Sequence, residues 1–417
     1  MYFNQPFITK KEISLVKKKL VEKKLSKFIG TLTNDTKKIL SYSSLEIKNK
    51  LPEPSFLGGV EVRGCEYLIS NITKRKYSIL FNSASSALYS AIKSLGLPSK
   101  SKIVVPAVSF SATISAVVAA NHIPVICDID KTTTMSVDSL NEILNKFEIK
   151  AVIFVQWCGN QGNIKNIAKL CYKNGIKLIE DSSQATLTRT SHGKYNGTFG
   201  DIGIYSFNEP KNLSSGEGGV AVSNNKIYSK AMRLTRNHAE AYQYFKDYNK
   251  FKNHISPGYN FRPTEYCAAI IRSQINRRSI INKYRIKNNL MIQKKLKNLL
   301  IPICSYKEYI PYSAGYFLSS DWKISKFQLA KILQKRGFSM FTGYPIEHWQ
   351  LFNDITKKHN LRFLKYYTDK FVCFFQIGFP VSKKNIDDLC NEIIKIFNNQ
   401  NKYLKISQNK VFSIGRK

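Results

Sequence analysis

Between residues 76 and 225 the sequence alternates short apolar runs with longer amphipathic segments, a pattern that few architectures accommodate. Strands that are apolar on both faces and alternate with helices form mainly parallel sheets covered on both sides. Runs rich in Val and Ile predict seven strands, at residues 76–81, 102–108, 123–129, 150–156, 177–181, 201–207 and 219–223. Amphipathic segments of helical length separate most of them, at 84–96, 111–121, 136–147 and 163–174. The sequence therefore predicts an α/β fold with a mainly parallel seven-stranded sheet in a large domain.

The rest of the chain predicts a second, smaller unit and less regular ends. Amphipathic helices with basic outer faces are expected at 10–27 and 325–337, and residues 30–56 are polar with no strong period. From about residue 285 the pattern changes to a small α+β unit. We therefore divide the chain into an N-terminal helix with an inserted basic and polar segment (1–56), a large domain (57–280), a small C-terminal α+β domain (281–400) and a basic tail (401–417).

Composition narrows the class of protein. The 417 residues are 43% hydrophobic, which is ample for a sizeable core. No apolar run is long enough to predict a transmembrane helix, and the first residues lack the basic-then-apolar order of a secretory signal. The eight cysteines are scattered singly, so the spacing suggests neither a disulfide framework nor a metal site. We expect a cytoplasmic protein with reduced thiols and no metal.

The net charge of +37, from 65 Lys and Arg against 28 Asp and Glu, has two explanations. One is a polyanionic partner such as nucleic acid or an anionic membrane surface. The other, which we favour, is a Lys- and Asn-rich composition with the lysines spread over solvated faces. No recognition helix or aromatic–basic motif supports specific binding of nucleic acid. The positive electrostatic field of such a protein would also attract a small anionic substrate.

Residues that directly follow the predicted strands have the greatest functional interest, because ligands of such sheets bind beyond the carboxyl ends of the strands. Ser85 and Ser86 open the helix after the first strand, where free backbone N–H groups favour an anion. Their alternative role is ordinary helix capping. Phe110 follows the second strand and places an aromatic ring at the rim, or else packs in the core.

Two later strand ends carry opposite charges. Asp181 ends the run 177–181 and Gln184 follows it, and a carboxylate there is costly unless it is paired. Ser206 and Lys211 follow the next strand, in the stretch SFNEPKNLSSGEGG. Lys211 lies 30 residues after Asp181 (211 − 181), so one crossover brings both to the same crevice. The alternative for Lys211 is a solvated charge in a loop between strands.

Pyridoxal phosphate is the ligand that uses all of these groups. It needs an anion site for its phosphate, an aromatic neighbour for its ring, a carboxylate for its pyridine nitrogen and a lysine for its aldehyde. In this hypothesis Asp181 keeps the ring nitrogen protonated, so that the ring accepts electrons when a substrate Cα–H bond breaks. Lys211 holds the aldehyde as a Schiff base, is displaced by the incoming amine and then acts as general base and acid.

The order and spacing of several motifs resemble one known family. These are FLGGVEVRGCEYLI, NSASSAL, VVPAVSFSAT, PVICDID, LIEDSSQA, FGDIGIYSF, PKNLSSGEGG, RNHAE and GYNFRPTEYCAAI, which together run from about residue 57 to residue 275. The sequence is similar to the DegT/DnrJ/EryC1/StrS group of pyridoxal-phosphate-dependent sugar aminotransferases. The resemblance implies the type I fold of pyridoxal-phosphate aminotransferases.

The resemblance also implies roles for individual residues. Lys211 would carry the cofactor, Asp181 would pair with its pyridine nitrogen, Gln184 would lie beside the ring and its 3-hydroxyl, and Phe110 would stack on the ring. Binding of the phosphate is implied for Ser85, Ser86 and Ser206, and for Asn260 in the site of the neighbouring subunit of a homodimer with shared active sites. Roles near the substrate pocket or its supporting turn are implied for His238 and Glu217, with a purely structural histidine as the alternative for His238.

The sequence departs from the family pattern at a few positions. Ala84 replaces a common Gly, Pro210 replaces the usual Thr or Ser before the lysine, Thr186 replaces a common His, and residues 155–160 differ from the usual run. These changes bear on the substrate more than on the cofactor. Relatives that carry His in place of the lysine are dehydratases, and the presence of Lys211 disfavours that activity here.

The expected activity is transfer of an amino group, with glutamate as the expected donor, to a keto group of a nucleotide-linked sugar in glycan or lipopolysaccharide biosynthesis. The sequence leaves open the sugar, the carbon and the stereochemistry. One alternative keeps the cofactor and uses a ketocyclitol or an aminobenzoate precursor. Another is a non-catalytic regulator that binds the cofactor, or a basic scaffold.

Overall fold

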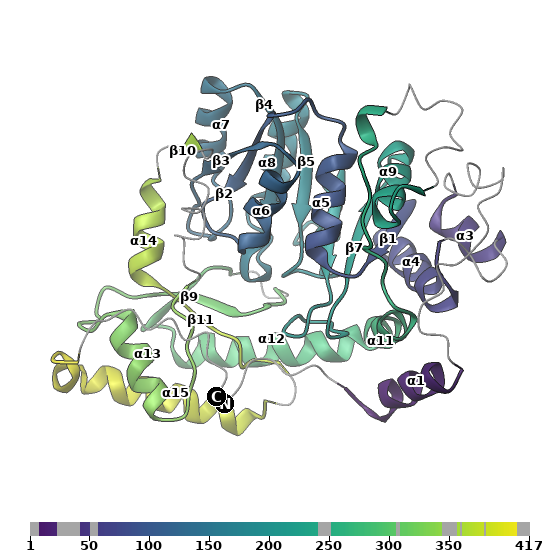
Figure 1. Ribbon diagram of the computed structural model, residues 1–417. Helices are drawn as coiled ribbons and strands as arrows, with labels where there is room; N and C mark the ends of the chain where they lie inside the picture. The colour runs from purple at the N-terminus through teal and green to yellow at the C-terminus, as the bar shows by residue number, and fades with distance from the viewer. Residues whose placement is uncertain are drawn as a thin grey trace.

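The computed structural model describes residues 8–22, 42–50, 57–240, 252–305, 309–343, 357–358, 361–378 and 381–406. Its largest feature is a sheet with the strand order β1-β7-β6-β5-β4-β2-β3-β10 (Figure 1). The strands are β1 (Tyr77–Phe81), β2 (Lys102–Pro106), β3 (Ile123–Cys127), β4 (Ile149–Val155), β5 (Lys177–Asp181), β6 (Ile202–Ser206), β7 (Gly219–Ser223) and β10 (Lys357–Lys358). The seven predicted strands are thus confirmed, and the two-residue β10 extends the edge beside β3.

The sheet is mainly parallel, with one antiparallel strand. β7 runs antiparallel to both of its neighbours, β1 and β6, while β6, β5, β4, β2 and β3 pair in parallel. Asp181 pairs with Val155 on one side and Ile204 on the other, so β4, β5 and β6 end close together. The topology therefore brings the residues after these strands to one edge.

Helices cover both faces because the strand side chains are apolar on both sides. On one face α5 (Ala84–Ser94), α6 (Ser111–Ala119) and α9 (Lys226–Arg236) pack on residues such as Ile79, Val105 and Ile179. On the other face α7 (Val137–Lys146) and α8 (Ile164–Lys173) pack on β2–β5, and α4 (Val60–Thr73) and α11 (Glu265–Asn276) pack on β1, β6 and β7. This is the doubly covered sheet that the sequence predicts.

The smaller unit contains a three-stranded antiparallel sheet in the order β11-β9-β8. Its elements are α12 (Arg278–Lys295), β8 (Leu300–Pro302), β9 (Ala314–Leu318), α13 (Lys326–Lys335), α14 (Arg362–Lys370), β11 (Phe371–Phe374) and α15 (Lys383–Asn398). α12, α13 and α15 share an apolar core with this sheet. Leu364, Tyr367 and Phe371 instead join the core beneath the large sheet. The predicted α+β unit is confirmed, and the predicted boundary at residue 281 falls inside α12.

The described residues of the N-terminal region include two short helices. α1 (Lys10–Val21) lies on α11, where Glu12 is paired with Arg277 and Lys19 Nζ lies 3.1 Å from Glu61 Oε1. α3 (Ser44–Lys50) packs on α4, so the polar segment 30–56 includes a helix that the sequence did not predict. Residues 30–41 and 51–56 of that segment, and residues 407–417 of the tail, lie outside the described part of the chain.

Candidate active site

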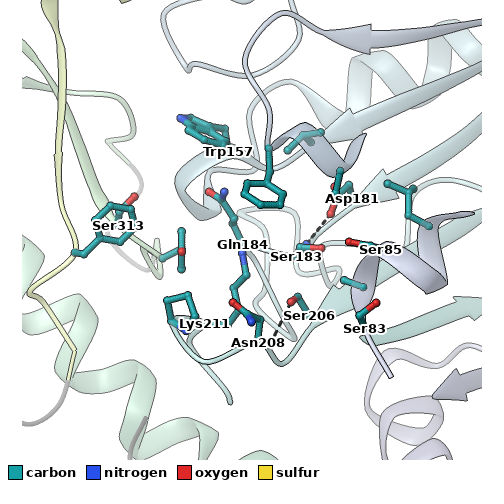
Figure 2. A pocket seen from close by; sticks show the side chains of 18 of the residues that line it. Ser83, Ser85, Trp157, Asp181, Ser183, Gln184, Ser206, Asn208, Lys211 and Ser313 are labelled. Carbon is teal, nitrogen blue, oxygen red and sulfur yellow. Dashed lines mark hydrogen bonds between the residues drawn. The ribbon is translucent and has the colours of Figure 1, made fainter. Parts of the chain in front are cut away.

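A cavity of about 470 Å³ lies between the carboxyl ends of the large sheet and the small unit (Figure 2). Its lining includes residues that follow β1, β2, β4, β5 and β6, together with residues of the small unit. Figure 2 shows Ser83, Ser85 and Ser206 toward one end and Lys211 and Ser313 toward the other. The predicted convergence of strand ends therefore produces a cavity of the size typical of small-molecule sites.

The end with the serines is built around the N-terminus of α5. Ser83 is the N-cap and its Oγ accepts a hydrogen bond from Ser86 N at 3.1 Å. Ser85 and the buried Ser206 line the cavity, and Ser206 Oγ accepts from Asn208 N at 3.3 Å. Free N–H groups and hydroxyls at a helix N-terminus suit an anion.

Ser86 lies outside the cavity lining. Its hydroxyl donates to Asn82 Oδ1 at 2.7 Å and lies 2.9 Å from Ser83 Oγ. Ser86 is thus the residue that Ser83 caps rather than the cap itself, and its predicted role in phosphate binding stays a prediction.

The carboxylate and the ring-facing residues lie at the middle of the cavity. Asp181 is 8% exposed, and its oxygens accept from Ser183 N at 3.1 Å and from Thr113 Oγ1 at 3.4 Å. Gln184 lines the same wall and accepts from Cys158 N at 2.6 Å. Phe110 is 53% exposed at the start of α6, so it does not pack in the core. Phe110 lines the cavity instead.

Lys211 follows β6 and reaches the cavity from the opposite end. Its backbone N–H donates to Asn208 O at 3.0 Å, which closes a tight turn through Pro210. Its Nζ lies 4.5 Å from the centroid of the Tyr312 ring. Burial lowers the pKa of Lys211 to about 8, although Asp181 and Glu217 oppose this shift. Lys211 is thus half-buried and activated, unlike a solvated loop lysine.

Three other predicted residues lie in different places. Glu217 lines the cavity and accepts from Asn208 Nδ2 at 2.7 Å. His238 and Asn260 are exposed and do not line it. They are neighbours in the fold, since His238 N donates to Tyr259 O at 3.1 Å and Asn260 pairs with Asn237. Their proposed parts in the substrate pocket and in a partner's phosphate site stay predictions.

Sequence patterns single out no individual residue of the wall that the small unit contributes. Tyr312, Ser313, Phe341, Cys373 and Phe375 line the cavity, but they lie far along the chain from the motifs and only folding brings them there. The cavity is also lined by Trp157, Ser183 and Asn208, which lie within or beside the family motifs but have no role predicted from sequence.

The described residues include neither a membrane-spanning helix nor a metal-binding cluster. No described helix has both the length and the apolarity required to cross a bilayer. The same residues contain no group of three or more His, Cys, Asp or Glu side chains arranged to hold a metal ion.

The fold is that of the pyridoxal-phosphate aminotransferases. The aminotransferase from Psychrobacter cryohalolentis matches with a TM-score of 0.79 at 21% identity, covering 95% of this chain and 99% of that one. An E. coli GDP-4-keto-6-deoxy-D-mannose-3-dehydratase, solved with bound hydrated PLP, matches with a TM-score of 0.76 at 20% identity, covering 94% and 99%. Similarities at these identities establish the fold alone.

Sequence comparison identifies the family within this fold. Residues 44–368 match the DegT/DnrJ/EryC1/StrS aminotransferase family, and the chain belongs to it. The GDP-perosamine synthase of Vibrio cholerae is 31% identical over 249 residues, which are 59% of this chain and 65% of that protein. The match thus spans slightly less than two thirds of that relative's length.

Proposed function

We propose that this protein is a pyridoxal-phosphate-dependent aminotransferase that acts on a keto group of a nucleotide-linked sugar. The observation that carries the proposal is the position of Lys211, with its lowered pKa, in the same cavity as Asp181 and a helix N-terminus. Family membership supports the reaction class, and the name of the Vibrio cholerae relative supports a nucleotide-linked sugar.

The residues along the cavity match the chemical groups of this cofactor, from its phosphate to its aldehyde. The N-terminus of α5 with Ser85 and Ser206 suits the phosphate. Gly219 lets β7 pass directly beneath this helix end, because a Cβ there would lie 2.3 Å from Ala84 N. Asp181 suits the protonated ring nitrogen, and Lys211 suits the aldehyde.

When bound, pyridoxal phosphate supplies an electron-accepting ring and an aldehyde that bonds to amines. The protein's part falls to a few residues. The two hydrogen bonds that Asp181 accepts hold its carboxylate in place as a fixed negative charge. A pKa of about 8 rather than 10.5 gives Lys211 roughly 300-fold more neutral amine at pH 7. Lys211 can therefore act as a nucleophile and move a proton at the substrate carbon that carries the nitrogen.

The finer assignments are part of the same proposal. Glutamate is the proposed amino donor, and the net charge of +37 favours an anionic diphosphate substrate. A homodimer in which Asn260 completes the partner's site is supported by the exposure of Asn260 on the surface. We place the reaction in the cytoplasm, in glycan or lipopolysaccharide biosynthesis.

The test uses purified protein with pyridoxal phosphate, ¹⁵N-glutamate and a panel of nucleotide-linked keto sugars. We expect a visible absorption band of the lysine-bound cofactor, and ¹⁵N in a sugar product detected by mass spectrometry. Lys211→Ala is expected to abolish both. A sugar product that has lost oxygen without gaining nitrogen would indicate a dehydratase. Absence of cofactor binding by the wild-type protein would refute the proposal.

A further inference from the structure

The segment 309–313 of the small unit closes the cavity on the side of Lys211. Its backbone and side chains are hydrogen-bonded to Cys158, in the loop of the large unit after β4. Cys158 O accepts from Tyr312 N at 3.0 Å and from Tyr309 Oη at 2.5 Å, and Ser313 Oγ lies 3.1 Å from Cys158 Sγ. Because Cys158 N also donates to Gln184, this segment is held in register with the middle of the cavity.

Arg285 of α12 fixes the same segment from behind. The residue is only 3% exposed, and its Nη1 donates to Tyr312 O at 2.9 Å and to Pro311 O at 3.3 Å. Among the described residues Arg285 forms no ion pair, and burial lowers its pKa to about 10. A buried guanidinium is costly to maintain, so its use on two backbone carbonyls points to a need for an accurate position of Tyr312.

The face of the Tyr312 ring is directed at Lys211. Lys211 Nζ lies 4.5 Å from the ring centroid, within the range of a cation–π interaction. Tyr312 is 8% exposed and packs edge-on against Phe375, with centroids 5.3 Å apart. The ring therefore has little freedom to turn away. The titratable groups that line the cavity with Lys211 are Asp181, Glu217, Tyr312 and Cys373.

We propose that Tyr312 is a positioning residue, whose ring face holds the ammonium of Lys211 while this lysine has no covalent partner. The inference rests on the proposed function, in which Lys211 alternates between a bound and a free state. An uncharged ring holds the cation without engaging Asp181 or Glu217 in a tight ion pair. Both carboxylates then stay available for cofactor and substrate. Arg285 acts through Tyr312 by fixing its backbone.

The test measures the free lysine in protein from which the cofactor has been removed. Acylation of Lys211 is followed against pH by peptide mass spectrometry, with the exposed Lys100 as an internal standard. The variants are Tyr312→Leu, which keeps apolar bulk but lacks a ring face, and Tyr312→Phe, which keeps the ring. A cation–π interaction stabilises the charged amine, so its loss lowers the pKa of Lys211.

We expect the labelling midpoint to fall by about 0.5–1.5 pH units in Tyr312→Leu, roughly a 3- to 30-fold change in the ionisation equilibrium. Tyr312→Phe is expected to retain the wild-type midpoint, which a purely structural role of the tyrosine hydroxyl would not predict. Arg285→Met, which frees the segment, is expected to shift the midpoint in the same direction as Tyr312→Leu. If Tyr312→Leu does not fold, Tyr312→Met takes its place in the same comparison.

An unchanged or raised midpoint in the ring-less variant overturns the inference. This result is separable from the proposed function, because labelling requires neither cofactor nor substrate. If the wild-type protein is active and the labelling midpoint of Lys211 is the same with and without the Tyr312 ring, only the positioning role is refuted. An inactive protein with the expected shift refutes only the aminotransferase.

Discussion

Gly219 offers the most direct test of how the fold builds the proposed phosphate site. This first residue of β7 pairs with Phe81 at the end of β1 and with Ser206 at the end of β6. A Cβ there would lie 2.3 Å from each of Ala84 N, Ser83 C and Ser83 O. All three are backbone atoms at the start of α5, so none can rotate away. The change Gly219→Ala must therefore move the helix end itself.

The size of the effect follows from these contacts. The contacts are 0.7 Å shorter than the 3.0 Å below which a neighbour must shift (3.0 − 2.3), so the start of α5 has to move by a similar amount. Overpacking of this kind costs about 1–3 kcal/mol in the free energy of unfolding. In the proposed site, misplacing the N–H groups weakens one or two charge-assisted hydrogen bonds to the cofactor phosphate, about 1.5–3 kcal/mol each. We expect affinity for pyridoxal phosphate to fall by about 10- to 100-fold.

Urea denaturation of the cofactor-free protein and fluorescence titration with pyridoxal phosphate measure the two effects. The matched control is Gly175→Ala, where no heavy atom lies within 4 Å of the added Cβ but φ is +65°. Left-handed backbone costs a non-glycine residue about 1–2 kcal/mol, so this control is expected to lose stability and keep its cofactor affinity. If Gly219→Ala binds the cofactor as tightly as the wild type, the anion site does not depend on the start of α5.

Three further changes test other parts of the structure. Glu66→Ala is expected to lower the free energy of unfolding by about 3–5 kcal/mol in urea, because it leaves buried the guanidinium of Arg236, whose Nη1 lies 2.8 Å from Glu66 Oε1. Glu66→Gln, which keeps a hydrogen-bond acceptor for Arg236, should lower the free energy of unfolding by less than Glu66→Ala. Lys211→Met is expected to stabilise the cofactor-free protein below pH 8, since it removes a half-buried charge. This advantage should shrink as the pH rises from about 8 toward 10.5, where the wild-type lysine is already neutral in the folded state; a gap that is constant with pH would contradict the lowered pKa. His122, whose pKa burial lowers to about 4, contributes stability that is present above pH 6.5 and lost as the pH falls toward 4. His122→Gln should flatten the acid limb of the stability–pH curve, and an identical limb would refute this assignment.

The elements of the large unit were predictable because each strand and helix carries its own periodic signal. The seven strands and the helices near 84–96, 111–121, 136–147 and 163–174 all form close to their predicted bounds. β10 was not predictable, because two lysines carry no strand pattern and pair only where β3 offers an edge. α3 was missed for a similar reason: its packing on α4, rather than a strong amphipathic period, accounts for it.

Some residues of the candidate site could likewise be predicted from sequence and others could not, and the order of the strands in the sheet explains the difference. β5 and β6 are adjacent parallel strands, so consecutive strand ends deliver Asp181 and Lys211 to one crevice without any long-range information. Ser85 joins them because the single antiparallel strand β7 lies between β1 and β6, a placement that sequence alone does not require. Tyr312 comes from the small unit and is positioned by Cys158 and Arg285, and no sequence pattern links it to Lys211. Site residues that follow neighbouring strands can thus be predicted from their spacing in the sequence. Site residues from the small unit cannot, because their position depends on how the two hydrophobic cores pack together.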